Sequence, residues 1–149
     1  MRRDIMAIEL TSVSAKLVSG LKVDADARGH VLRLDEPKNL GGTDTGMNPV
    51  EAVLSGLAGC KLIVAKSFAA KNNIKFRSIA IDMEGELDPD GFLGLNPEAK
   101  IGFSKIKTIY HIDSDHTQEE IKDFIDFIDR TCPVLDTIIN TPEFETEIR

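Results

Sequence analysis

Two cysteines are the side chains of this sequence most able to do chemistry. Cys60 follows Gly59 inside a long apolar stretch, and Cys132 stands directly before Pro133. Free cysteines are often buried and behave as small hydrophobic side chains, so an inert structural role is open for each. Two features favour reactivity: small neighbours leave space around the Cys60 thiol, and Cys132 lies where a short helix is expected to begin, a position that favours the thiolate. The two thiols could form a peroxidatic and resolving pair.

Glu51 is the acidic residue whose position suggests a role beside them. Residues 48–51, Asn-Pro-Val-Glu, favour a helix start in which Glu51 reaches back to the Asn48 cap, and this capping role is the simpler interpretation. On one helix, Glu51 and Cys60 would point about 180° apart and lie ~13–14 Å apart along the axis. Their midpoint falls at the small residues 55–56. If two copies of the helix crossed antiparallel there, Glu51 of one chain would approach Cys60 of the other, which predicts a dimer with sites at the interface.

Other polar residues form no recognisable site. His30, His111 and His116 lack the spacing of metal ligands, and the glycine-rich residues 41–46 lack the Gly-Lys-Ser/Thr of a phosphate loop. Two cysteines are also too few for a structural zinc site or a secreted disulfide scaffold. We therefore expect neither a metal nor a bound cofactor.

Composition indicates one ordinary globular domain spanning residues 1–149, with 42% hydrophobic and 29% charged residues. The formal net charge of −7 argues against binding to nucleic acid or to an anionic membrane surface. The charged start at Met1–Arg3 is not followed by the apolar run of a signal peptide. The longest apolar stretch, residues 52–65, contains Lys61 and is shorter than the ~20 residues of a transmembrane helix. We therefore expect a cytoplasmic location.

Hydrophobic periodicity predicts the elements that must position these side chains. Strands are expected over 12–18, 21–27, 30–36, 76–87 and 103–112, with a last strand after Pro142. Helices are expected from 49 to about 71, behind the Thr117–Glu120 capping box, and from 133 to 139. The first of these is apolar nearly all round, which is typical of a buried central helix, and glycines 56 and 59 in its interior suggest that something packs closely there. The expected class is α+β, with antiparallel sheets around one long helix.

Several of these motifs together resemble the OsmC/Ohr family. They are Gly41-Gly42, Gly46 to Glu51, the Leu57-Ala58-Gly59-Cys60 block, Glu84 to Pro89, Gly102-Phe103 and the distant Thr131-Cys132-Pro133-Val134. The resemblance covers most of the chain from about residue 13. It is carried mainly by the combination of the Asn-Pro-x-Glu…Ala-Gly-Cys block with the distant Cys-Pro.

The resemblance implies an OsmC-like fold, an intertwined homodimer with each site built from both chains, and a thiol-dependent, peroxiredoxin-like reduction of organic hydroperoxides in oxidative stress defence. By that analogy Cys60 is the peroxidatic cysteine and Cys132 is the resolving cysteine. Glu51 would help to hold an arginine against the thiolate and the substrate. No bound cofactor is implied, because the reductants of the family are external dithiols, including lipoylated proteins.

One departure from the family concerns that arginine. Peroxidases of the family place it in the N-terminal hairpin or in the loop before the Asn-Pro, but here the loop over residues 37–47 offers only Lys38. The hairpin offers Lys22, and Arg28 lies on the turn that follows. A lysine supplies a point charge without the bidentate fork of arginine, and Cys60 is too far along its helix to use the helix dipole. Either Arg28 reaches the site, or a lysine substitutes, or the thiol chemistry differs.

Two other classes of function stay open from the sequence. One is a non-catalytic OsmC-like binding module for a small hydrophobic or thiol ligand. The other is an oligomeric structural or stress protein whose cysteines are inert. The apolar residues around the central helix favour, for the peroxidase, an organic peroxide over hydrogen peroxide.

Overall fold

The computed structural model describes residues 8–149 and divides the chain into two compact units, with the boundary between Ala52 and Val53. That boundary lies within the long helix α1 (Pro49–Phe68). The charged start at Met1–Arg3, part of the argument against a signal peptide, lies outside the described residues. That residues 1–149 form a single domain stays a prediction.

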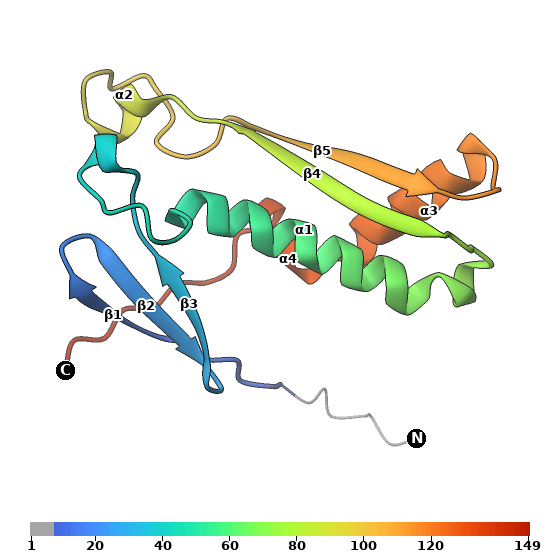
Figure 1. Cartoon of the computed structure of the whole chain (residues 1–149), viewed down its shortest axis with the longest axis horizontal. Helices are drawn as coiled ribbons and strands as arrows, with labels where there is room; N and C mark the ends of the chain where they lie inside the picture. The colour runs from blue at the N-terminus through green and yellow to red at the C-terminus, as the bar shows by residue number, and fades with distance from the viewer. Residues whose placement is uncertain (1–7) are drawn as a thin grey trace. The chain divides into compact units, whose positions relative to one another are not determined.

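The first unit contains a three-stranded antiparallel sheet in the order β1-β2-β3 (Figure 1). Its strands are β1 (Ser14–Ser19), β2 (Lys22–Ala27) and β3 (His30–Leu34), as the alternation of residue types predicts. Arg28 and Gly29 both have positive φ, +56° and +84°, and form the tight turn between β2 and β3. No hydrophobic side chain among residues 8–52 is buried. The sheet therefore contributes no buried hydrophobic side chain to a core within the described residues.

The loop after β3 is organised by one buried carboxylate. Asp35 is only 2% exposed. Its carboxylate accepts hydrogen bonds from the backbone N–H groups of Glu36 at 2.8 Å, Thr43 at 3.2 Å and Thr45 at 3.1 Å. The Thr43 and Thr45 hydroxyls also donate to it. Gly42 lies so close to the carbonyl of Glu36 that a Cβ would collide with it. The glycine and the carboxylate together hold the loop, which contains the short 3-10 helix η1 (Lys38–Leu40), against the end of β3.

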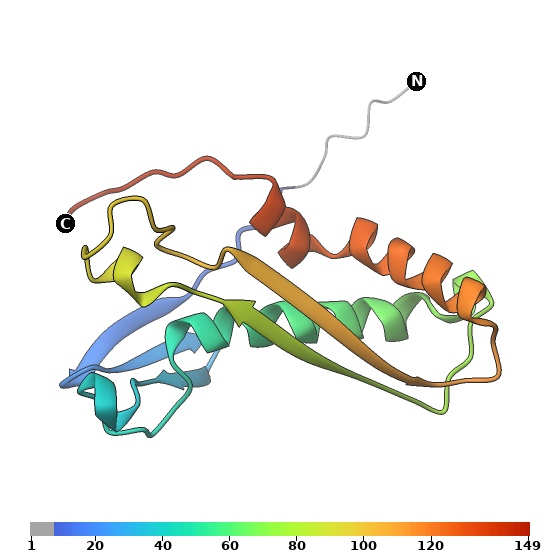
Figure 2. The ribbon, with the colours of Figure 1, turned by 90° about the horizontal axis from the view of Figure 1, so that it is seen from above.

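The second unit contains an antiparallel hairpin and the helices that carry the cysteines. After α1 come the 3-10 helix η2 (Ala70–Asn72), β4 (Ser78–Glu86), α2 (Pro89–Phe92), β5 (Lys105–Asp113), α3 (Gln118–Thr131) and α4 (Pro133–Ile139). The β4–β5 hairpin crosses α1, and α3 lies alongside the C-terminal half of α1 (Figures 1 and 2).

The core of this unit joins α1, α3 and the hairpin. Its buried members are Val64, Ala65, Ile74, Phe124 and Ile128, and Ile79 and Tyr110 of the hairpin pack against them. Residues 124 and 128 are one turn apart on α3, so the predicted apolar face of this helix is confirmed.

The predicted last strand is wrong. No strand forms in the described residues after Pro142, where the chain is irregular and Phe144 is 81% exposed. A strand needs a neighbouring edge for its backbone hydrogen bonds, and none of the five described strands pairs with this segment.

Helix α1 is buried along one stripe only. Leu57, Lys61, Val64 and Ala65 are buried, whereas Ile63 is 69% exposed. The close packing predicted at Gly56 and Gly59 is not found among residues 8–149, because a Cβ at either glycine would meet no atom within 4 Å. Among residues 8–149, α1 therefore has a second side, at Gly56, Gly59 and Ile63, that is not buried.

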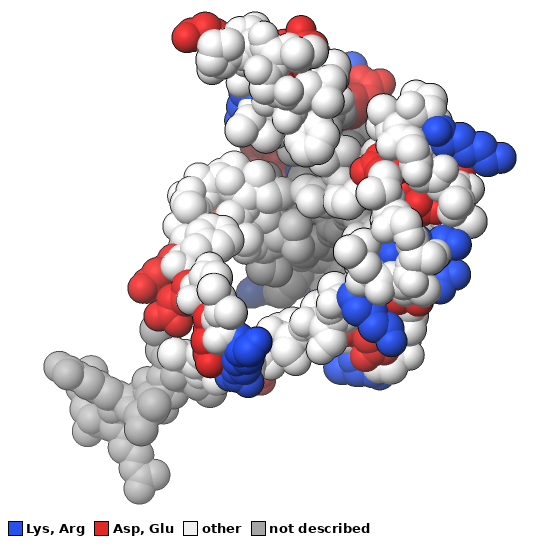
Figure 3. Space-filling view, turned by 90° about the vertical axis from the view of Figure 1, so that its left-hand side faces the viewer, with Lys and Arg blue, Asp and Glu red and all other residues white. Residues whose placement is uncertain are grey.

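The described surface mixes charges of both signs. On the face drawn in Figure 3, lysine and arginine side chains lie among acidic ones and form no broad basic surface. None of the described helices is long and apolar enough to cross a membrane.

Candidate functional site

Two helical segments of the second unit position the cysteines. Cys60 lies in the middle of α1, is partly buried and packs against the core. Cys132 is 1% exposed and lies between α3 and α4, where its backbone N–H ends α3 by donating to the carbonyl of Ile128 at 2.9 Å. Its Sγ caps α4 by accepting from the backbone N–H of Leu135 at 3.4 Å. Pro133 at the first position of α4 separates the two helices, since it has no N–H to continue the first one.

The structure brings the two thiols together. Both cysteines are free, and the Cys60 thiol is near enough to Cys132 to raise the pKa of the Cys132 thiol. Burial raises the pKa of the Cys132 thiol, and the neighbouring Cys60 raises it further, while the N–H of Leu135 acts in the opposite direction. The predicted helix start at Cys132 is confirmed, but the expectation that it would favour the thiolate is wrong in net direction because burial outweighs the helix N-terminus.

A buried lysine beside Cys60 was missed by sequence reasoning. Lys61 is 4% exposed, and its Nζ donates to Asp129 Oδ1 at 2.7 Å and to Thr108 Oγ1 at 3.3 Å. Its ammonium also lies 5.9 Å from the centre of the Tyr110 ring. The available signal was a charged residue within the apolar stretch 52–65, which the sequence analysis used only to exclude a membrane span.

Tyr110 belongs to the same neighbourhood. Its hydroxyl is buried and has no hydrogen-bond partner among residues 8–149. Burial raises the pKa of Tyr110 well above its usual range, and the nearby Asp129 and Cys132 raise it further. The hydroxyl therefore stays protonated and uncharged near the thiols.

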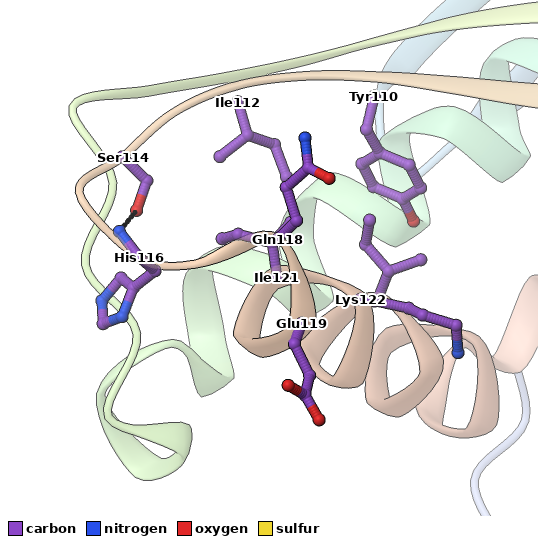
Figure 4. Close-up of a pocket in the computed structure, with 9 residues that line it drawn as sticks. Tyr110, Ile112, Ser114, His116, Gln118, Glu119, Ile121 and Lys122 are labelled. Carbon is purple, nitrogen blue, oxygen red and sulfur yellow. Dashed lines mark hydrogen bonds between the residues drawn. The ribbon is translucent and has the colours of Figure 1, made fainter.

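The described part of this unit contains at least two pockets. The larger, about 650 Å³, lies between β5 and α3, with Tyr110, Ile112 and Ile121 on its apolar floor and neither cysteine in its lining (Figure 4). The smaller, about 400 Å³, is lined by Lys61, Asp129 and Thr108 together with apolar side chains that include Leu57 and Leu135. Neither cysteine lines the smaller pocket, but it contains Lys61, which follows Cys60, and Leu135, whose backbone N–H donates to Cys132.

Glu51 forms the predicted cap. Its Oε2 accepts from the backbone N–H of Asn48 at 2.8 Å, and its own N–H donates to Asn48 Oδ1 at 2.9 Å. The second oxygen of a carboxylate can still accept from a cation. A pairing of Glu51 with an arginine at the Cys60 thiolate stays a prediction.

The three candidate activating cations all belong to the first unit. Lys22 begins β2, Arg28 lies on the β2–β3 turn and Lys38 begins η1. Which of them serves Cys60, which lies in the second unit, stays a prediction.

The histidines take structural positions. His111 Nε2 pairs with Asp82 across the β4–β5 hairpin at 2.7 Å, and His116 Nε2 accepts from the backbone N–H of Lys75 at 3.0 Å. No three His, Cys, Asp or Glu side chains within residues 8–149 are arranged to hold a metal ion.

Comparison with known proteins gives one family and several relatives. The model of the family described as OsmC-like protein matches residues 42–147. A hydroperoxide reductase of Mycoplasma genitalium is 35% identical over 106 residues, which are 69% of this chain and 70% of that protein. A hydroperoxide reductase of Mycoplasma pneumoniae is 29% identical over 109 residues, 71% of this chain and 72% of that protein.

A solved structure has the same fold. The crystal structure of an OsmC-like protein from Mycoplasma pneumoniae superimposes with a TM-score of 0.78 at 28% identity, covering 89% of each chain.

Proposed function

The chain belongs to the OsmC-like protein family, and from that premise we propose that it is a thiol-dependent, peroxiredoxin-like peroxidase that reduces organic hydroperoxides in oxidative stress defence. The names of its two Mycoplasma relatives, both hydroperoxide reductases, support a peroxide-related enzyme. The observation that carries the proposal is the adjacency of the Cys60 and Cys132 thiols, which come from different helices and meet at the edge of the core.

In the proposed first step, the Cys60 thiolate attacks the outer oxygen of the hydroperoxide. The O–O bond breaks, Cys60 becomes a sulfenic acid, and the alkoxide takes up a proton and leaves as an alcohol. Cys60 is partly exposed whereas Cys132 is 1% exposed, which supports Cys60 as the thiol that meets the peroxide.

In the second step, Cys132 attacks the Cys60 sulfur, the S–O bond breaks, and hydroxide leaves as water with the proton of Cys132. The raised pKa of Cys132 supports this order, because a thiol that keeps its proton is the poorer nucleophile toward the peroxide in the first step. An external dithiol, such as a lipoylated protein, then reduces the disulfide. Because this cycle needs a continuous supply of thiol reductant, we place it in the cytoplasm.

The apolar surface of each unit supports a homodimer. In the first unit none of the hydrophobic side chains of the sheet is buried, and in the second α1 presents Gly56, Gly59 and Ile63 to open space. The exposed large residues on β1–β3 and α1 are Leu17, Val18, Val31, Leu32, Val50, Val53 and Ile63. Large apolar side chains left exposed in each unit support an interface with another chain. A partner copy crossing α1 would make it the buried central helix and would bring a cation and Glu51 of one chain to Cys60 of the other.

The proposal is tested by intact mass of the reduced protein after one equivalent of cumene hydroperoxide, followed by a peptide map. We expect a loss of two hydrogens and a Cys60–Cys132 link. Cys60→Ser should abolish the reaction. Cys132→Ser should leave the first oxidation intact and stop at a Cys60 sulfenic acid, since serine preserves the cap of α4 but cannot form the disulfide.

Two outcomes would contradict the proposal. Retained peroxide turnover in Cys60→Ser would exclude the mechanism. An unchanged mass of the wild-type protein after minutes would exclude a peroxidase and favour the binding module for a hydrophobic or thiol ligand.

A further inference from the structure

The side chain of Lys61 is only 5% exposed, and it is charged. Lysine is almost never fully buried unless it is paired, because moving its ammonium out of water costs several kcal/mol. Here the pair is made with Asp129, whose side chain is 42% exposed, so the partner reaches the surface while the lysine does not. Such a costly arrangement needs a reason beyond stability, since a buried ion pair is weak evidence for stability.

The position of the pair suggests that reason. Lys61 directly follows Cys60 on α1, and Asp129 precedes Cys132 by three residues on α3. The ion pair therefore ties together the two helices at the level of the two thiols. Thr108 adds a third attachment from β5, through its hydroxyl at 3.3 Å from Lys61 Nζ.

We propose that Lys61 and Asp129 form a positioning pair that holds the Cys60 and Cys132 sulfurs in register for disulfide formation. This inference rests on the proposed function, in which Cys60–SOH and Cys132–SH give a disulfide and water. The pair touches neither the peroxide nor the bond that breaks. It sets the distance and direction from which one sulfur approaches the other.

Geometry favours positioning over activation of Cys60 by Lys61. Successive residues of a helix point about 100° apart, so the Lys61 side chain leaves α1 in a different direction from Cys60. Its ammonium is directed to the Asp129 carboxylate, which neutralises its charge. A disulfide has a narrow range of allowed geometry, with an S–S bond of about 2.05 Å and a restricted dihedral angle. A misplacement of about 1 Å can slow a reaction up to ~100-fold.

The first experiment measures the approach of the thiols without peroxide. The reduced protein is equilibrated with mixtures of oxidised and reduced glutathione, and the fraction of Cys60–Cys132 disulfide is read by mass after acid quenching. In this equilibrium the protein dithiol loses two electrons and two protons to oxidised glutathione, giving two reduced glutathiones. Because no hydroperoxide takes part, the result is independent of peroxidase activity.

We compare two variants. Lys61→Met keeps a long apolar side chain but removes the charge, and Lys122→Met is the matched control. Lys122 pairs with Asp126 on α3 at 2.8 Å. This is also a lysine–aspartate ion pair, but both side chains are exposed. We expect the disulfide equilibrium constant to fall about tenfold in Lys61→Met and to change less than about twofold in the control. Equal constants in Lys61→Met and the wild-type protein would overturn the inference.

The second experiment reads the fate of Cys60 sulfenic acid under cumene hydroperoxide. A positioning defect leaves the rate of the first oxidation unchanged but slows the reaction of the Cys60 sulfenic acid with Cys132. Lys61→Met should therefore accumulate Cys60 sulfinic acid, a gain of two oxygens over the thiol. A slower first oxidation with no sulfinic acid would instead assign Lys61 to activation of the thiol and overturn positioning. If the wild-type protein fails to react with peroxide, the proposed function fails, and the glutathione result still decides whether the pair aligns the thiols.

The double variant Lys61→Met/Asp129→Leu guards against misfolding. Replacing both charges by apolar side chains avoids an unpaired buried charge and is often neutral or stabilising. If the pair serves positioning, the double variant should fold with an undiminished melting temperature and still show the lowered disulfide constant. A wild-type constant in the folded double variant would overturn the inference.

Discussion

Asp35 shows how one side chain organises a loop. Its carboxylate accepts from the backbone N–H groups of Glu36, Thr43 and Thr45 and from two hydroxyls. These hydrogen bonds hold the pKa of Asp35 far below its usual value of 3.8, and the largest effect comes from the Thr43 hydroxyl. The charged form is therefore bound much better in the folded protein than in the unfolded chain.

Asp35→Asn should lower the melting temperature by several degrees near neutral pH, since an amide nitrogen cannot accept from Thr43 or Thr45. The pKa of Asp35 is lower in the folded protein than in the unfolded chain. Its stabilisation is therefore complete above the pKa of the unfolded state and is lost as the pH falls toward the pKa of the folded state. The difference between wild type and variant should thus be constant above about pH 5 and shrink below it. Thermal unfolding followed by circular dichroism between pH 7 and pH 3 measures this.

Asp44→Asn is the matched control. Asp44 is exposed in the same loop with a φ of +56°, which asparagine tolerates, so removing this charge should cost little. A difference between wild type and Asp35→Asn that does not depend on pH would contradict the role given to the carboxylate.

Local signals predicted some site residues and not others. The cap at Asn48–Glu51 and the helix start at Cys132 depend on residues three apart in sequence, so sequence patterns reveal them. The Lys61–Asp129 pair joins residues 68 positions apart, and only the packing of α3 on α1 brings them together. The same packing explains why the net pKa direction of Cys132 could not be predicted: burial is a tertiary property.

At the scale of elements, periodicity predicted every described strand and every long helix. The β4–β5 hairpin pairs in unbroken register from Ser78–Asp113 to Glu86–Lys105, as alternation over both segments suggested. The strand predicted after Pro142 does not form, because a strand also needs a neighbouring edge and none of the described strands offers one to this segment.

The start of α3 provides a test at this scale. Thr117 Oγ1 accepts from the Glu120 N–H at 3.2 Å, and Glu120 Oε2 accepts from the Thr117 N–H at 2.9 Å, a complete capping box. Thr117→Ala should lower the free energy of unfolding by about 1 kcal/mol, as N-cap removal generally does. Urea denaturation measures it. Thr117→Ser keeps the hydroxyl and should retain most of the stability; equal losses in both variants would show that the cap is not the cause.

At the scale of the molecule, the open side of α1 is the feature to explain. A helix that is apolar nearly all round is normally enclosed, and here one side of it meets no described atom at Gly56 or Gly59. Sequence reasoning predicted an enclosed helix, but residues 8–149 leave the side of α1 at Gly56 and Gly59 open. The proposed second copy would cover that side.

Gly56→Leu separates a monomer from the proposed dimer. In a lone chain a side chain at residue 56 meets nothing within 4 Å, and replacing glycine in a helix interior should stabilise it by up to about 1 kcal/mol. In a dimer whose helices cross there, leucine should block the crossing. We expect light scattering to find a wild-type dimer whose melting temperature rises with protein concentration, and a weakened dimer for Gly56→Leu.

Gly102→Leu is the control, since residue 102 also faces open space but lies outside α1. A monomeric wild-type protein, or a Gly56→Leu variant that dimerises as well as the control, would refute the crossing.

The cap formed by Cys132 has a consequence for evolution. The sulfur that would resolve the sulfenic acid also begins α4, and serine is a better helix cap than cysteine. A single-nucleotide change from a cysteine to a serine codon would therefore abolish redox chemistry at this position while keeping a side chain that can cap α4. A lineage could pass from a catalyst to a non-catalytic descendant in one step, with the shape of the protein preserved and its surfaces free to acquire another use.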